Sequence, residues 1–114
     1  MLNDEDAKLV TLARQARARI QAADGAAVRD EMGRSYSGAT IDLPGLHVPA
    51  LALAVAQAAA AGAQSIEAAV VVTSEGAPDT GPLRHLIAPG GLLHTCSPSG
   101  EVLRSDVFST DGIG

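Results

Sequence analysis

The chain has 114 residues, of which 46% are hydrophobic and 18% are charged, a balance typical of one globular domain. Its formal net charge is −5 and its only aromatic residues are Tyr36 and Phe108. It therefore lacks the basic surface and the stacking side chains that nucleic-acid binding requires. The single cysteine, Cys96, excludes a disulfide within the chain and a cysteine-rich zinc site.

The longest apolar stretch, residues 48–63, is interrupted by Gln57 and is too short to span a bilayer. The N-terminus is acidic where a secretory signal peptide is basic. We therefore expect a cytoplasmic protein with no membrane contact and no nucleic-acid partner. Because many of its apolar residues are alanines, which bury little area each, we also expect self-association to supplement the core.

Apolar periodicity and turn residues predict one domain over residues 1–114, with residues 108–114 as a loose tail. The predicted elements, in chain order, are a helix over 4–20, strands over 25–29 and 35–42, a helix over 50–61, a strand over 66–73, a short helix over 83–87, and strands over 92–96 and 101–107. A hairpin followed by helical crossovers indicates an α/β fold with a five-stranded mixed sheet, in the order α-β-β-α-β-α-β-β.

The two long predicted helices differ in polarity. The first has Asn3 as its N-cap, acidic residues at 4–6 and arginines near its end, which we interpret as a solvated face that complements the helix dipole. The second, Ala50–Ala61, is apolar on nearly every face, so we expect it to be buried on all sides. Its small side chains suit close packing against a second copy, and we expect the chain to self-associate through this helix.

Three stretches together resemble the cytidine deaminase family. The sequence GAAV at 25–28, followed after a turn by Gly33 and YSG at 36–38, is similar to that family's first hairpin. The sequence ATID at 39–42 is similar to the segment that grips the nucleoside ribose. An alanine-rich helix ending in Ala-Gly, followed by an AVVV strand, stands at the family's interval. The resemblance covers roughly residues 5–105 and implies a three-layer α/β/α fold.

The family's zinc chemistry has no counterpart at the matching positions. In zinc deaminases a His or Cys and two further Cys hold the metal, and a glutamate moves the protons. The resemblance places the three ligand positions at Pro49, Thr80 and Leu83, and the proton-shuttle position at Leu51. No glutamate occurs within residues 43–66, so a small shift of the alignment does not restore the site. We therefore expect no catalytic residues and no zinc cofactor.

A substitute metal site remains an alternative. His47 precedes the lost ligand position and His85 lies near the lost thiolates, so these two histidines with Asp79 offer ligands that zinc accepts. In the other interpretation His47 caps the second helix and His85 is an exposed polar residue. His94 and Cys96 share one face of a strand, where we expect Cys96 to be a small buried side chain.

Thr40 and Asp42 are the candidate substrate-binding residues, because they keep much of the polar character of the Asn and Glu that the family uses to hold the ribose. In the alternative interpretation they are ordinary residues at the end of an edge strand. The sequence therefore favours a catalytically degenerate cytidine deaminase-like protein, a non-enzymatic scaffold or regulatory module that acts through protein contacts or a nucleoside-like ligand. The alternative is a zinc-dependent hydrolytic deaminase of cytidine or a related nucleoside that uses a non-standard site.

Overall fold

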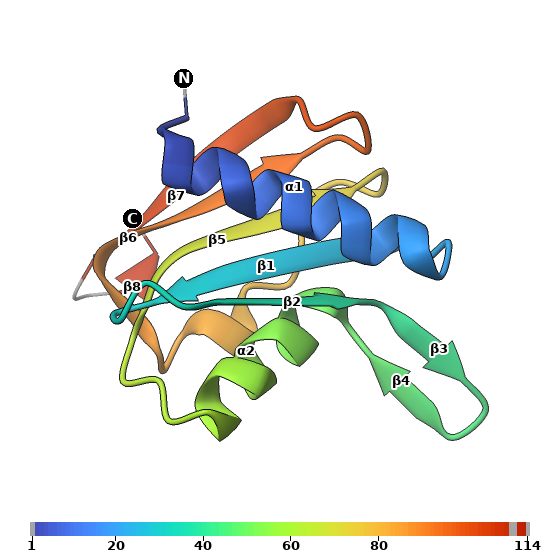
Figure 1. The fold of residues 1–114 in the computed structure, drawn as a ribbon, viewed down its shortest axis with the longest axis horizontal. Coiled ribbons are helices and arrows are strands. Elements are labelled where there is room, and N and C mark those ends of the chain that lie inside the picture. The colour runs from blue at the N-terminus through green and yellow to red at the C-terminus, as the bar shows by residue number, and fades with distance from the viewer. Residues whose placement is uncertain (1, 110–111, 114) are drawn as a thin grey trace.

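A mixed sheet forms the middle layer of the computed structural model, which describes residues 2–109 and 112–113. Helix α1 covers one face of the sheet and helix α2 covers the other (Figure 1). The elements are α1 (Asp4–Arg19), β1 (Asp24–Asp30), β2 (Ser35–Ala39), β3 (Ile41–Leu43), β4 (Leu46–Val48), α2 (Ala50–Ala60), β5 (Ile66–Thr73), the 3₁₀ turn η1 (Gly81–Leu83), β6 (Ile87–Cys96), β7 (Val102–Ser109) and β8 (Gly112–Ile113).

The strand order is β2-β1-β5-β6-β7-β8, with β5 and β6 parallel and the other neighbours antiparallel. This arrangement confirms the predicted three-layer α/β/α fold with a five-stranded mixed sheet, to which β8 adds a short sixth strand at the β7 edge. The strand predicted at 66–73 has the same bounds in the structure. Within the described residues, no helix is long and apolar enough to cross a membrane.

Helix α1 begins where the sequence predicts, because the Asn3 side chain accepts a hydrogen bond of 2.7 Å from the Asp6 N–H. Its inner face buries Leu9 and Ala13 against β1 and β5. The helix lies so close to the sheet that a Cβ added at Gly25 would collide with the Ala13 carbonyl oxygen. A glycine is therefore required where α1 crosses β1.

The β1–β2 hairpin is stabilised by Asp30, whose carboxylate is fully buried. It accepts hydrogen bonds from the N–H groups of Met32 and Arg34, from Nε of Arg34 and from the Tyr36 hydroxyl, at 2.9 to 3.2 Å. Burial alone raises the pKa of Asp30, but these hydrogen bonds and the Arg34 charge outweigh it and hold the pKa below its ordinary value.

The prediction that the alanine-rich helix is buried on all sides is wrong. One side of α2 packs on the sheet through residues such as Leu51, Ala54 and Val55, but Ala56, Ala59 and other residues of the opposite side are exposed. A helix in a three-layer domain has only one face against the sheet, so high alanine content does not imply burial all round.

Three other expectations need correction. The short helix predicted at 83–87 is only the single turn η1, because Ile87 pairs with Ile66 and already belongs to β6. The strand predicted at 35–42 ends at Ala39, and Gly45, with φ of 81°, closes a separate β3–β4 hairpin. Of the tail predicted to be loose over residues 108–114, Phe108 and Ser109 belong to β7 and residues 112–113 form β8, whereas residues 110, 111 and 114 lie outside the described residues.

Candidate functional site

Two adjoining cavities lie where the exit of α1, the end of β2 and the β3–β4 hairpin meet. The larger has a volume of about 550 Å³ and is lined by residues 20–23 and 40–43. The smaller has a volume of about 290 Å³ and is lined by Asp24, residues 40–42 and residues 47–49. Both cavities are lined by the two candidate binding residues, Thr40 and Asp42.

Two residues that line the smaller cavity, Asp24 and Thr40, each bury an oxygen that lacks a hydrogen-bond partner among the described residues: Oδ1 of Asp24 and Oγ1 of Thr40. The two residues are neighbours, because the Thr40 N–H donates a 3.0 Å hydrogen bond to the Asp24 carbonyl oxygen. A buried polar atom without a partner costs roughly 1–3 kcal/mol of desolvation. Such groups are satisfied when a ligand supplies the missing donor or acceptor.

The β3–β4 hairpin brings Asp42 opposite His47, and Nδ1 of His47 lies 2.7 Å from Oδ1 of Asp42. Both side chains are more than 70% exposed, at 72% for His47 and 79% for Asp42. His47 does not cap α2, since the N-cap is Pro49 with no side-chain hydrogen bond. The histidine instead adds a polar group to the rim of the smaller cavity.

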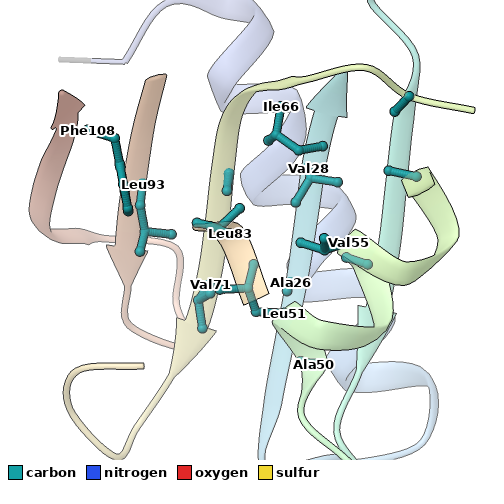
Figure 2. Close-up of a cluster of buried hydrophobic side chains, with 14 residues drawn as sticks. Ala26, Val28, Ala50, Leu51, Val55, Ile66, Val71, Leu83, Leu93 and Phe108 are labelled. Atoms are coloured by element: carbon teal, nitrogen blue, oxygen red, sulfur yellow. The ribbon is translucent and has the colours of Figure 1, made fainter. Parts of the chain in front are cut away.

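The positions that the resemblance assigns to zinc and to the proton shuttle hold side chains that do not fit that chemistry. Leu51 and Leu83 are buried, with 3% and 0% of their surface exposed, and belong to one apolar cluster with Ala50 and Val71 (Figure 2). Thr80 precedes η1 and has no thiolate or imidazole to offer. An apolar cluster of this kind excludes water and supplies no electron pair to a metal.

The substitute metal site proposed from sequence is not assembled in the described part of the chain. His85 is exposed after η1, and Oδ1 of Asp79 accepts a 2.9 Å hydrogen bond from the Gly81 N–H. No group of three His, Cys, Asp or Glu residues that could hold a metal ion occurs among the residues described. Cys96 is fully buried as expected, and burial raises the pKa of its thiol.

Sequence reasoning missed a buried polar network on the α1 side of the sheet. Oδ1 of Asp6 accepts a 2.9 Å hydrogen bond from Nη1 of Arg29, and Oδ2 lies 2.9 Å from Nε2 of His94. Nδ1 of His94 in turn lies 2.7 Å from Oγ of Ser105, so the imidazole connects the carboxylate to the hydroxyl. Neither of the two cavities is lined by Ser105, so we assign this network a structural role.

The interpretation of residues 4–6 as a solvated face is therefore wrong for Asp6, which is only 3% exposed. The sequence contains one indication that Asp6 is buried. Asp6 precedes Leu9 and Ala13 by three and seven positions, which places it on the buried face of the helix. The network links α1 to β1, β6 and β7 by ion pair and hydrogen bond.

Comparisons with known proteins agree with this architecture. The family model "Cytidine deaminase-like" matches residues 2–100. The structure is similar to a crystal structure of cytidine deaminase from Burkholderia pseudomallei, with 23% identity, a TM-score of 0.73 and 93% of each chain covered. A search of curated proteins finds no match. With nearly the whole described length matched by the family model, the chain belongs to the cytidine deaminase-like family.

Proposed function

We propose that this chain binds a nucleoside-like ligand through sugar hydroxyls and does not deaminate it, so that it acts as a regulatory or scaffold module. One observation carries the proposal: Asp24 and Thr40 line the smaller of two adjoining cavities, and their buried Oδ1 and Oγ1 have no hydrogen-bond partner within the part of the chain that the structure describes. Proteins rarely leave such atoms unpaired, and a ligand is one of the ways in which they are satisfied.

The chemistry of the unpaired groups selects the ligand class. An ionised Asp24 only accepts hydrogen bonds, whereas the Thr40 hydroxyl both donates and accepts. A vicinal diol supplies two O–H donors a short distance apart, which suits an adjacent carboxylate and hydroxyl. Asp42 and His47 at the rim extend the same acceptor-rich surface. The larger cavity, at about 550 Å³, is in the range of small-molecule sites.

The proposal that the chain does not deaminate its ligand is based on a different part of the molecule. Hydrolysis of an exocyclic amine requires an activated water and a group that moves protons to the leaving ammonia. Leu51 and Leu83 stand where the resemblance assigns the proton shuttle and one metal ligand, and both are packed in the apolar cluster. In this proposal the positions that the resemblance assigns to ribose binding keep polar side chains, whereas Leu51 and Leu83 at the positions assigned to the reaction are apolar.

Ligand binding is tested by the shift of the melting temperature with cytidine, uridine, their deoxy forms and the free bases. We expect ribonucleosides to raise it and free bases to leave it unchanged, since a ligand at 100 times its Kd adds about 2.7 kcal/mol to stability. Thr40→Val should abolish the shift. Thr95→Val is the matched control, because Thr95 also has a buried unpaired hydroxyl but lines neither cavity. A panel with no shift would remove the nucleoside from the proposal.

Deamination is tested separately by the metal content of protein purified without a chelator or a metal-affinity tag, followed by an ammonia assay with cytidine and added zinc. We expect neither stoichiometric zinc nor ammonia above the protein-free blank. Ammonia release would overturn the non-catalytic proposal and support the alternative, a zinc-dependent hydrolytic deaminase with a non-standard site. Binding without release would support both halves of the proposal.

Self-association through residues 50–61 and a cytoplasmic location are further parts of this proposal. The outer side of α2 exposes Ala56, Ala59 and Ala60, which allow a second backbone to approach closely. Ala56→Glu together with Ala60→Glu should reduce the mass measured by light scattering. An unchanged mass would remove this helix from the interface.

A further inference from the structure

Strand β7 has an open edge. Its inner side pairs with β6 along residues 102–107, but on its outer side β8 pairs only with Phe108 and Ser109. Among the described residues, no strand pairs with the outer side of residues 102–107. The N–H and C=O groups of such an edge are available to a strand from another chain.

The exposed apolar side chains of the molecule are concentrated on this strand. Of the seven large hydrophobic residues that are exposed in the described chain, three belong to β7: Val102, Leu103 and Val107. Leu103 and Val107 are 58% and 51% exposed. Apolar residues on an edge strand are what a pairing partner buries.

Between Leu103 and Val107 lies a charge pair on one strand. Nη2 of Arg104 donates a 2.8 Å hydrogen bond to Oδ1 of Asp106, and this contact raises the pKa of Arg104. Edge strands are commonly protected by charged side chains, especially lysine. Here the two charges neutralise each other, so this edge carries no net repulsion against a second strand.

We propose that β7 pairs antiparallel with β7 of a second copy, about a two-fold axis at Ser105. In this register Arg104 lies opposite Asp106 of the second copy and Leu103 lies opposite its Val107. When the sequence Leu-Arg-Ser-Asp-Val pairs with a reversed copy of itself, the basic residue faces the acidic one and the two apolar residues face each other. An isologous two-fold contact requires this property of a surface.

The charges also exclude the neighbouring two-fold registers. A shift of the axis to residue 104 places Arg104 opposite itself, and a shift to residue 106 places Asp106 opposite itself. Like charges directly opposite each other in a sheet are destabilising. Pairing is confined to residues 103–107, because β8 occupies the outer side of Phe108 and Ser109.

Charge reversal tests both the interface and its register. Arg104→Asp and Asp106→Arg should each halve the mass measured by sedimentation at high micromolar concentration, because each places like charges opposite each other. The exchanged variant, with both substitutions, should regain the wild-type mass. An equimolar mixture of the two single variants should form a complex with one of each, since aspartates of one chain then face arginines of the other.

Arg84→Asp is the control, since it makes the same change of charge at an exposed residue outside β7 and should leave the mass unchanged. Circular dichroism and melting temperature check that each variant folds. A wild-type chain that sediments as a single copy, or single reversals that leave the assembly intact, would overturn the proposal. Loss of assembly without recovery in the exchanged variant would overturn the register.

Hydrogen exchange offers a test that needs no substitution. On dilution from high to low micromolar concentration, amides within residues 103–107 should exchange faster, while those of β1 and β5 in the middle of the sheet should not change. Exchange that is independent of concentration along β7 would contradict the pairing. Faster exchange confined to α2 would instead place the contact on that helix.

Discussion

Two buried polar regions of this chain contain similar side chains that differ in how many of their hydrogen bonds are made. On the α1 side of the sheet, Asp6 and His94 each use both of their polar side-chain atoms. Near the end of β2, Asp24 and Thr40 each have a buried oxygen without a partner in the described part of the chain. Buried polar groups by themselves therefore do not identify a binding site. Unmade hydrogen bonds next to a cavity distinguish a candidate ligand site from a structural network, since Thr95 also has a buried unpaired hydroxyl but lines neither cavity.

The largest effect on the free energy of unfolding should come from disrupting the network around Asp6. Asp6→Ala removes the shared acceptor of Arg29 and His94 and leaves a guanidinium that is 15% exposed without its counterion. We expect the free energy of unfolding in urea to fall by about 3–5 kcal/mol. Glu5→Ala, which removes the exposed ion pair with Lys8, should change it by less than about 1 kcal/mol. Similar losses from the two variants would show that the buried network stabilises the fold no more than an exposed ion pair does.

A smaller loss is expected in the apolar cluster that contains Leu51 and Leu83. Leu83→Ala removes a fully buried side chain next to Leu51 and should lower the free energy of unfolding by about 3 kcal/mol. Leu43→Ala, at a side chain that is 55% exposed, is the control and should cost less than about 1 kcal/mol. If Leu83→Ala cost no more than Leu43→Ala, the cluster would not be a packed core.

Acid should weaken the hairpin around Asp30. Its pKa is held below the ordinary 3.8 in the folded chain, so its stabilising effect is complete above that pH and is lost as the pH falls through the folded-state value. Asp30→Asn should lower stability at neutral pH by about 2 kcal/mol, as expected for lost hydrogen bonds to a charged group. It should also reduce the fall in the urea midpoint between pH 5 and about pH 2. An identical acid profile in both proteins would contradict this assignment.

The smallest effect on the free energy of unfolding should come from a substitution at Thr40. Thr40→Val removes a buried hydroxyl that makes no hydrogen bond, so the free energy of unfolding without ligand should stay constant or rise by up to about 1 kcal/mol. Ser105→Ala, which removes one bond of the network around Asp6, should instead lower it by about 1 kcal/mol. A clear loss on Thr40→Val would mean that the hydroxyl already has a partner in the folded chain.

Most of the fold could be predicted from local sequence patterns. The β-branched run at 66–73 and the capped helix after Asn3 are strong local signals, and both elements occur as expected. The β3–β4 hairpin was missed because Pro44-Gly45 signals a turn without indicating whether strands flank it. The third helix was overestimated because pairing of Ile87 with Ile66 depends on contacts far apart in the chain.

The candidate site could be predicted only in part, for a similar reason. Thr40 and Asp42 were found from a family resemblance, and both line the cavities. Asp24 was missed because its place beside Thr40 follows from the pairing of β1 with β2. Asp6 was misinterpreted because an acid in the first turn also satisfies the helix dipole, which is a sufficient explanation until its burial is known.

Among the residues that the structure describes, β3 and β4 pair with each other and with no strand of the large sheet (Figure 1). The hairpin can therefore open locally without breaking the strand pairs that carry the core. Because Asp42 and His47 lie on this hairpin, any ligand held by them must also hold the hairpin closed. The affinity of such a ligand would then be the intrinsic affinity multiplied by the closed fraction, so a substitution at Gly45, whose φ of 81° closes the hairpin turn, would weaken binding by opening the hairpin.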